Sequence, residues 1–168
     1  MFQQIISDFG SWLTGLPTVG QFIMTVFISM IPIIEMRGAI PIAVVAGLPW
    51  PLAFTASVIG SMIPVPFIVA YIRRVFLWLK DRNKLARVIF RLEKKALSKA
   101  KSVYKYELLG LGVFVAIPLP GTGAWSGALI AALLNMRLRD SLLVIFAGVV
   151  TASGVICVIS YGVKAILG

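Results

Sequence analysis

Two charged residues, Glu35 and Arg37, stand two positions apart inside an apolar stretch of the chain. Within the hydrocarbon of a bilayer each charge costs at least about 2.5 kcal/mol on insertion scales, so such charges are usually functional. A desolvated glutamate can titrate near neutral pH, and the guanidinium fork of an arginine suits a phosphate. We expect proton coupling at Glu35 and anion binding at Arg37. The alternative is a structural salt bridge that holds the segment shut.

A second group of candidate residues lies in a stretch of prolines and glycines that begins at Pro118. The prolines cannot continue a helix, and the glycines permit backbone N–H groups to turn toward a ligand. Helices starting near Gly123 and after Gly38 would point their positive N-terminal ends at one place. The alternative is close packing at a turn. The predicted binding and coupling residues are Glu35, Arg37, Gly38, Pro41, Pro118, Pro120, Gly121, Thr122, Gly123, Trp125 and Ser126.

The composition indicates a membrane protein and excludes several kinds of site. Hydrophobic residues make up 60% of the chain and charged residues 13%, whereas a soluble domain is nearer half apolar and a quarter charged. Histidine is absent and Cys157 is the only cysteine. These counts exclude disulfide frameworks, Cys/His zinc sites and histidine-based triads. We therefore expect no metal, no cofactor and no enzymatic activity.

The basic residues are concentrated in two connections. Twelve of the sixteen lysines and arginines lie within residues 73–106, and two more lie within 137–139. Short basic connections are typical of the cytoplasmic side, so both are predicted to be cytoplasmic, with the uncharged turn at 48–51 and both termini external. We expect one multi-pass membrane domain, residues 1–168, in a prokaryotic cytoplasmic membrane.

The chain between residues 107 and 137 is too short to cross a membrane twice, since each crossing takes about 20 residues. It is therefore predicted to form a re-entrant helical hairpin, with arms at 108–117 and 123–135. A full span over 141–166 follows it.

The first half is predicted to repeat this arrangement from the other side. A helix over 18–31 is interrupted between Pro32 and Pro41 and is followed by a short arm to Gly47 and a span over 52–72. Two copies of a hairpin and a span in opposite orientations make an inverted repeat, which is common in secondary transporters. The predicted fold is thus all-α, with repeats over 17–72 and 107–168. An offset of 85 residues aligns Gly38-Ala39 with Gly123-Ala124.

Two peripheral elements complete the predicted architecture. Residues 1–16 carry apolar side chains at helical spacing, typical of a helix in the membrane interface. The linker over 73–106 is predicted to be a basic amphipathic helix attracted by anionic lipids of the inner leaflet; the alternative is a solubilising face that only determines the topology. No pattern for reading DNA accompanies its charge, so nucleic acid is not an expected partner.

The two interrupted segments resemble the paired motifs of the small multidrug export proteins. The matching residues run from Glu35 to Pro41 and from Ile117 to Trp125. The architecture is also similar to the DedA (VTT-domain) superfamily, whose members have two opposed re-entrant hairpins. That resemblance implies lipid scrambling or proton-coupled return of undecaprenyl phosphate, with Glu35 as the acid, Arg37 as the arginine and Pro118 to Gly121 as the proline-rich partner. DedA hairpins carry charges in both halves, whereas here the second hairpin has none.

Three functions are consistent with these features. The first is a proton-coupled secondary transporter of a lipid-linked phosphate, in which Arg37 holds the anionic head. The second is an exporter of cationic amphiphiles, in which Glu35 binds the cargo. The third is a non-transporting membrane scaffold or assembly factor. A homodimer is compatible with each of them.

Overall fold

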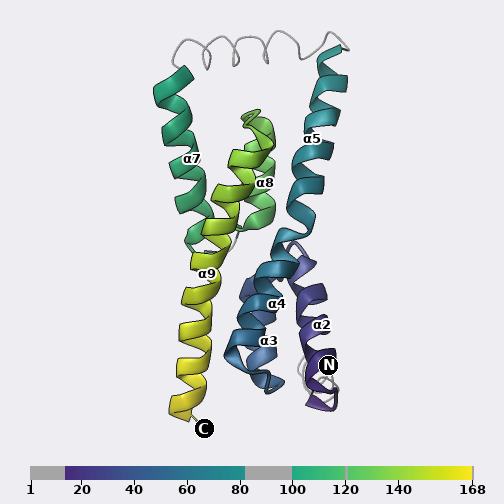
Figure 1. Ribbon diagram of the computed structural model, residues 1–168, viewed down its shortest axis with the longest axis vertical. Coiled ribbons are helices and arrows are strands. Elements are labelled where there is room, and N and C mark those ends of the chain that lie inside the picture. The colour runs from purple at the N-terminus through teal and green to yellow at the C-terminus, as the bar shows by residue number, and fades with distance from the viewer. Residues whose placement is uncertain (1–13, 82–99, 120, 168) are drawn as a thin grey trace.

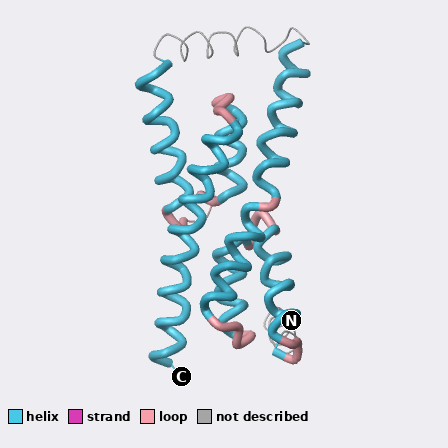
Figure 2. The backbone as a smooth tube through the Cα atoms, in the orientation of Figure 1, coloured by secondary structure: helices cyan, strands magenta, loops and turns pink. Residues whose placement is uncertain are grey.

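The computed structural model describes residues 14–81, 100–119 and 121–167, and in these residues it contains helices and no strand (Figures 1 and 2). The predicted all-α class is therefore confirmed. The helices are α2 (Thr18–Met30), α3 (Glu35–Val45), α4 (Trp50–Met62), α5 (Pro64–Asp81), α7 (Ala100–Ala116), α8 (Ala124–Leu133) and α9 (Leu138–Leu167).

Within the described residues, two helical segments are long and apolar enough to cross a membrane. They run over Trp50–Ile72, which joins α4 to α5, and over Leu138–Ile166 in α9. Both contain the spans predicted from the sequence, 52–72 and 141–166. The predicted interfacial helix over 1–16 lies almost entirely outside the described residues. Of the basic linker over 73–106, the structure describes only the two ends, as the last turns of α5 and the first turns of α7.

The shorter helices form two hairpins that enter the molecule from opposite ends (Figure 1). Helices α2 and α3 meet near the middle of the molecule, and so do α7 and α8, approaching from the other end. Helices α4–α5 and α9 run along the full length beside them. Helix α3 packs against α9, and α8 packs against α5, so each hairpin contacts the long helix of the other half.

The interruption in the first hairpin is shorter than predicted. It covers residues 31–34, and Pro41 lies within α3 rather than in the break. A proline has no N–H and so removes one bond from a helix, yet packing of the buried face of α3, which includes Met36 and Ile40, keeps the helix continuous. The second interruption, residues 117–123, is three residues longer than the first.

The two turns that leave the hairpins have the same hydrogen bonds, 88 positions apart. In the first, the N–H groups of residues 46, 47 and 48 donate to the carbonyls of 42, 44 and 43. In the second, those of 134, 135 and 136 donate to 130, 132 and 131. This pattern closes a helix with one residue in the left-handed region, here Gly47 at φ +84° and Asn135 at φ +51°.

A close helix crossing is also repeated in the two halves. A Cβ atom placed on Gly60 of α4 would lie 2.3 Å from the carbonyl oxygen of Val26 in α2. A Cβ atom placed on Gly148 of α9 would lie 3.0 Å from the carbonyl oxygen of Gly112 in α7. Gly60 and Gly148 are again 88 positions apart, so the long helices correspond in the same register as the turns.

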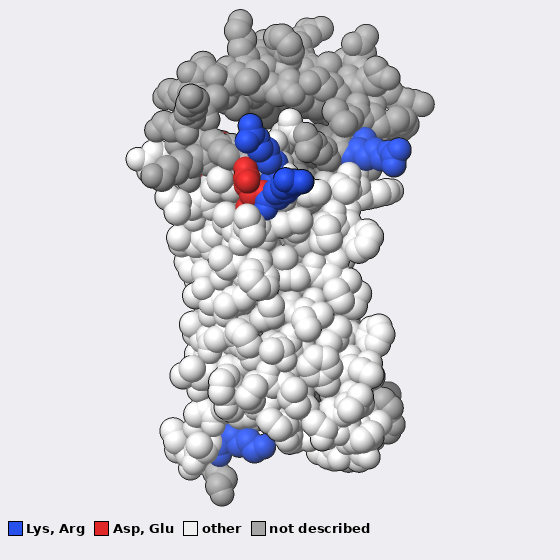
Figure 3. Space-filling view, in the orientation of Figure 1, with Lys and Arg blue, Asp and Glu red and all other residues white. Residues whose placement is uncertain are grey.

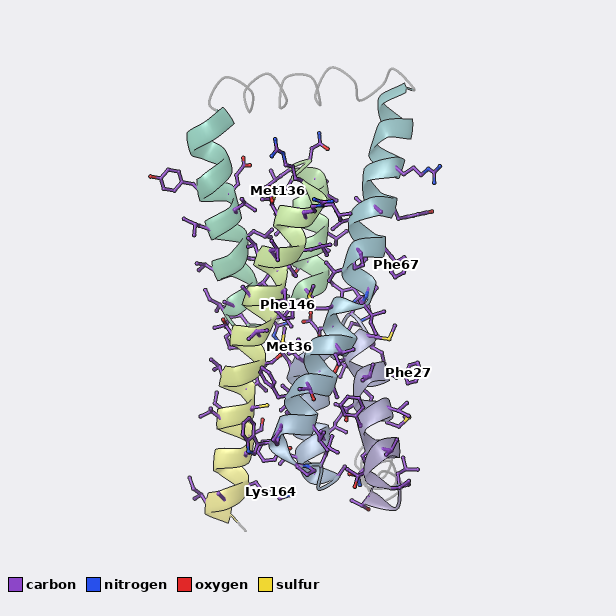
Figure 4. All side chains as sticks on the ribbon, viewed as in Figure 1. Phe27, Met36, Phe67, Met136, Phe146 and Lys164 are labelled. Carbon is purple, nitrogen blue, oxygen red and sulfur yellow. The ribbon has the colours of Figure 1, made fainter. Side chains whose placement is uncertain are left out.

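The surface seen in Figure 3 carries no charged side chain over its middle, and its basic groups lie toward the two ends. Large apolar side chains point outward along this zone, among them Phe27 at 59% exposure, Phe67 at 72% and Phe146 at 47% (Figure 4). An exposed apolar surface of this extent is unfavourable in water. It suits the acyl chains of a membrane.

Candidate functional site

Glu35 begins helix α3 at the tip of the first hairpin and is buried, with 2% of its surface exposed. Its backbone lies in the left-handed region at φ +47°, which is uncommon for a residue with a side chain. Its N–H donates to the carbonyl of Ile31 across the break. This conformation costs free energy, and such residues are concentrated at functional sites.

The Glu35 carboxylate lies against the first residues of helix α8, in the other hairpin. Its Oε1 accepts the backbone N–H of Ala124. A Cβ atom placed on Gly123 would lie 1.8 Å from Oε2 and 2.4 Å from Cδ, so only glycine leaves room for the carboxylate. A negative charge at a helix N-terminus is stabilised by the helix dipole. The anion position predicted for a ligand is therefore occupied by a side chain of the same chain.

Arg37 connects the two hairpin tips. Its Nη1 donates to Glu35 Oε2 at 2.8 Å, while its Nη2 donates to the carbonyl oxygen of Thr122 at 2.8 Å and to its hydroxyl at 3.0 Å. The salt bridge that was the alternative to ligand binding is thus present. It does more than close one hairpin, because Arg37 also holds the opposite hairpin.

The other polar residues at this meeting point shape the second tip. The Thr122 hydroxyl contacts the carbonyl oxygen of Ile117 at 2.6 Å within its own loop. The Ser126 hydroxyl accepts the N–H of Gly123 at 2.9 Å. The indole N–H of Trp125 donates to the carbonyl of Met30 at the end of α2, at 3.2 Å, and so adds a third link between the hairpins.

Four of the predicted site residues have other positions in the described structure. Gly38 packs inside its own hairpin, where a Cβ atom would lie 2.4 Å from Ile34 Cγ2. Pro41 is exposed on α3, and Pro118 is half-buried in the loop. A Cβ atom placed on Gly121 would meet no neighbour, so this position favours glycine because of its φ of +90° and not because of close packing. Pro120, also predicted, lies outside the described residues.

Several groups that complete the site have no signal in the pattern of residue types. Ala124 and Met30 contribute only backbone atoms, which no side-chain motif reveals. Met36 follows Glu35 and is fully buried, and its sulfur is 3.1 Å from the hydroxyl of Ser153 in α9. The signal for Ser153 is a polar residue inside the apolar span predicted over 141–166.

A separate apolar cavity of about 380 Å³ lies between α4 and α9, toward the chain's C-terminal end. Its lining contains aromatic rings and no charged side chain: Trp50, Phe54, Gly154, Cys157, Val158 and Tyr161. The Tyr161 hydroxyl donates to the carbonyl of Leu48, which fixes the ring beside the turn that precedes α4. Predominantly apolar clefts with a few fixed polar groups are typical of sites for small organic molecules.

Comparison with known proteins identifies the family. Residues 35–156 match the family described as "Putative small multi-drug export protein". The match covers most of the chain, so this chain belongs to that family and is a membrane protein of an export class. The resemblance to the DedA superfamily has no counterpart in this match. No curated protein and no solved structure matches the chain.

Proposed function

We propose that the chain is a proton-coupled secondary exporter of lipophilic small molecules, and that the contact between its hairpin tips opens and closes during transport. The observation that carries this proposal is the position of Glu35. It is buried at the meeting point of two oppositely directed hairpins and bonds to both of them. The family match supports export of small molecules.

The mechanism follows from the charges at the tips. An ionised Glu35 accepts bonds from Ala124 and Arg37, and bonds to charged groups contribute about 1.5–3 kcal/mol each. Protonation removes the carboxylate charge, which weakens its bond to Arg37 and its interaction with the α8 N-terminus. The two hairpins then separate more easily. Proton binding and opening of the tips are thereby linked.

The apolar cavity between α4 and α9 is the proposed place for the cargo. Its rings and lack of charged lining suit the apolar body of a drug-like molecule, and an aromatic face also attracts a cation. The lipid-phosphate hypothesis has less support, because both terminal nitrogens of Arg37 are already bonded within the chain. Direct capture of a cation by Glu35 is also disfavoured, because both of its carboxylate oxygens already accept hydrogen bonds, from Arg37 and from Ala124.

We also propose that both hairpins are re-entrant and that the halves form an inverted repeat in the membrane. The equal turns and the equal glycine crossings, each 88 positions apart, support this placement. Breaks in the helices at membrane depth require polar partners from the protein, and Glu35, Arg37 and Thr122 supply them.

This placement predicts that the two turns face opposite sides of the membrane. Single cysteines at Pro49 and Leu134, both exposed, should be introduced into a variant in which Cys157 is replaced by alanine. A membrane-impermeant maleimide added outside intact cells should label Pro49→Cys and leave Leu134→Cys unlabelled until the membrane is opened. Labelling of both positions from the same side would exclude the inverted repeat.

The coupling role predicts the behaviour of Glu35→Gln. Glutamine keeps the acceptor for the Ala124 N–H but cannot titrate, so we expect pH-driven export of a lipophilic dye from proteoliposomes to fall at least tenfold. Glu107→Gln is the matched control, since Glu107 is a partly buried acid in the middle of α7, away from the tips. Equal export by Glu35→Gln and wild type would refute proton coupling at this residue.

A further inference from the structure

The interiors of the two halves differ in chemistry although their backbones correspond. Helix α4 corresponds to α9 at an offset of 88 positions, and the repeated glycine crossing pairs Val26 with Gly112, so α2 corresponds to α7 at an offset of 86. Four hydroxyl-bearing residues are buried in the first half where the second half has buried aliphatic residues. They are Thr25, Ser29, Ser57 and Ser61, and their counterparts are Leu111, Val115, Ile145 and Val149.

Two of these hydroxyls lack a hydrogen-bond partner in the part of the chain that the structure describes. Thr25 donates to the carbonyl of Gln21 at 2.7 Å and Ser29 to that of Thr25 at 2.8 Å, within α2. Ser57 and Ser61 are fully buried, and their hydroxyl oxygens make no hydrogen bond within the described residues. Buried polar groups in proteins almost always have a partner, from the protein or from water. These two side chains therefore mark places where water is favoured.

A third buried group without a partner is Nε of Arg37, so all three such atoms in the described residues belong to the first half. Helices α2 and α4 run in the same direction, from the end of the molecule that bears the turn at residues 48–51 toward its middle (Figure 1). Because Gly60 meets α2 between Val26 and Ser29, Ser61 lies near the tip and Ser57 about one turn further out. The hydroxyls thus extend from the Glu35–Arg37 pair toward the outer end.

We propose that the hydroxyl-lined interior between α2 and α4 is a hydrated path that carries protons between Glu35 and the end of the molecule bearing the turn at residues 48–51. The proton passes along water molecules bonded to these hydroxyls and is accepted by a carboxylate oxygen of Glu35. The charged group facing that carboxylate is Arg37 on its own helix, and α8 presents backbone N–H groups. The role of Glu35 rests on the proposed function; the hydration of the path does not.

The aliphatic counterparts in the second half provide matched positions for a test of hydration. In the Cys157→Ala variant, single cysteines at Ser57 and Ser61 should react with a small water-soluble methanethiosulfonate at least tenfold faster than cysteines at Ile145 and Val149. Reaction should occur from the side that labels Pro49→Cys. Rates no higher than those of Ile145→Cys and Val149→Cys would overturn the path. If Ser57→Cys or Ser61→Cys does not fold, Thr25→Cys takes its place under the same criterion.

A second measurement tests whether the path carries protons. The double variant Ser57→Ala/Ser61→Ala should export a lipophilic dye at least fivefold more slowly under a pH gradient. Ser141→Ala is the control, because Ser141 is a buried serine of α9 whose hydroxyl donates to the backbone carbonyl of Arg137. Normal export by the double variant would overturn the proton path. An absence of export in the wild type would instead refute the proposed function, and the labelling rates would still decide whether the path is hydrated.

Discussion

Replacement of Gly123 by alanine is expected to reduce export at least tenfold and to lower the stability of the protein. The added Cβ atom would lie 1.8 Å from Glu35 Oε2, so the carboxylate must leave the N-terminus of α8. The bond to the Ala124 N–H is then lost. Loss of a hydrogen bond to a charged group costs about 1.5–3 kcal/mol. Thermal unfolding in detergent and dye export from proteoliposomes measure the two effects.

Two other glycines separate this effect from a general intolerance of substitution. Gly110 in α7 has open space where a Cβ would be, so Gly110→Ala should export normally and gain up to about 1 kcal/mol from helix propensity. Gly121→Ala meets no neighbour but is strained by its φ of +90°, at a cost of order 1–3 kcal/mol. Normal export by Gly123→Ala would show that the contact of Glu35 with α8 is dispensable.

Much of the architecture was predictable because membrane topology depends on length and charge. The stretch between the two basic connections is too short for two spans, and this alone predicted the hairpin formed by α7 and α8. The convergence of Glu35, Arg37 and Thr122 followed from the idea that two broken helices meet in the middle. The described structure brings these three residues together.

Other features depend on packing and could not be obtained from residue types. The sequence predicts a break that extends to Pro41, but the buried face of α3 keeps the helix intact through this proline. The offset of 85 that aligns Gly38 with Gly123 differs from the 88 of the turns, so Gly123 is not the counterpart of Gly38 in the register of the turns.

The partner of Arg37 illustrates the same limit at the site. A guanidinium and a helix N-terminus predict an anion but not its source, and the structure supplies it as Glu35, which lies in the same helix as Arg37 and in the hairpin opposite the N-terminus of α8. What reads in the sequence as a ligand site is thus a contact between two halves of one chain. The proposed function requires this contact to act as a gate that is stable when closed and opens when the charge of Glu35 changes.

Removing Arg37 alone should therefore be more damaging than removing both charges. In Arg37→Met the buried Glu35 carboxylate loses its ion-pair partner, and breaking a buried pair from one side costs about 3–5 kcal/mol. In the double variant Glu35→Gln/Arg37→Met no charge is left uncompensated, and glutamine still accepts the Ala124 N–H. We expect the double variant to recover most of the lost stability in thermal unfolding.

Export should not recover with stability, because the double variant has no group at the tips that titrates. Lys164→Met is the matched control: it removes a cation whose bond goes to the carbonyl of Val44 at the outer end of the molecule, and export should continue. If the double variant exports like the wild type, the pair only holds the hairpins together and proton coupling lies elsewhere. If Arg37→Met is as stable as the wild type, the pair does not hold the tips, and the proposed gate is wrong.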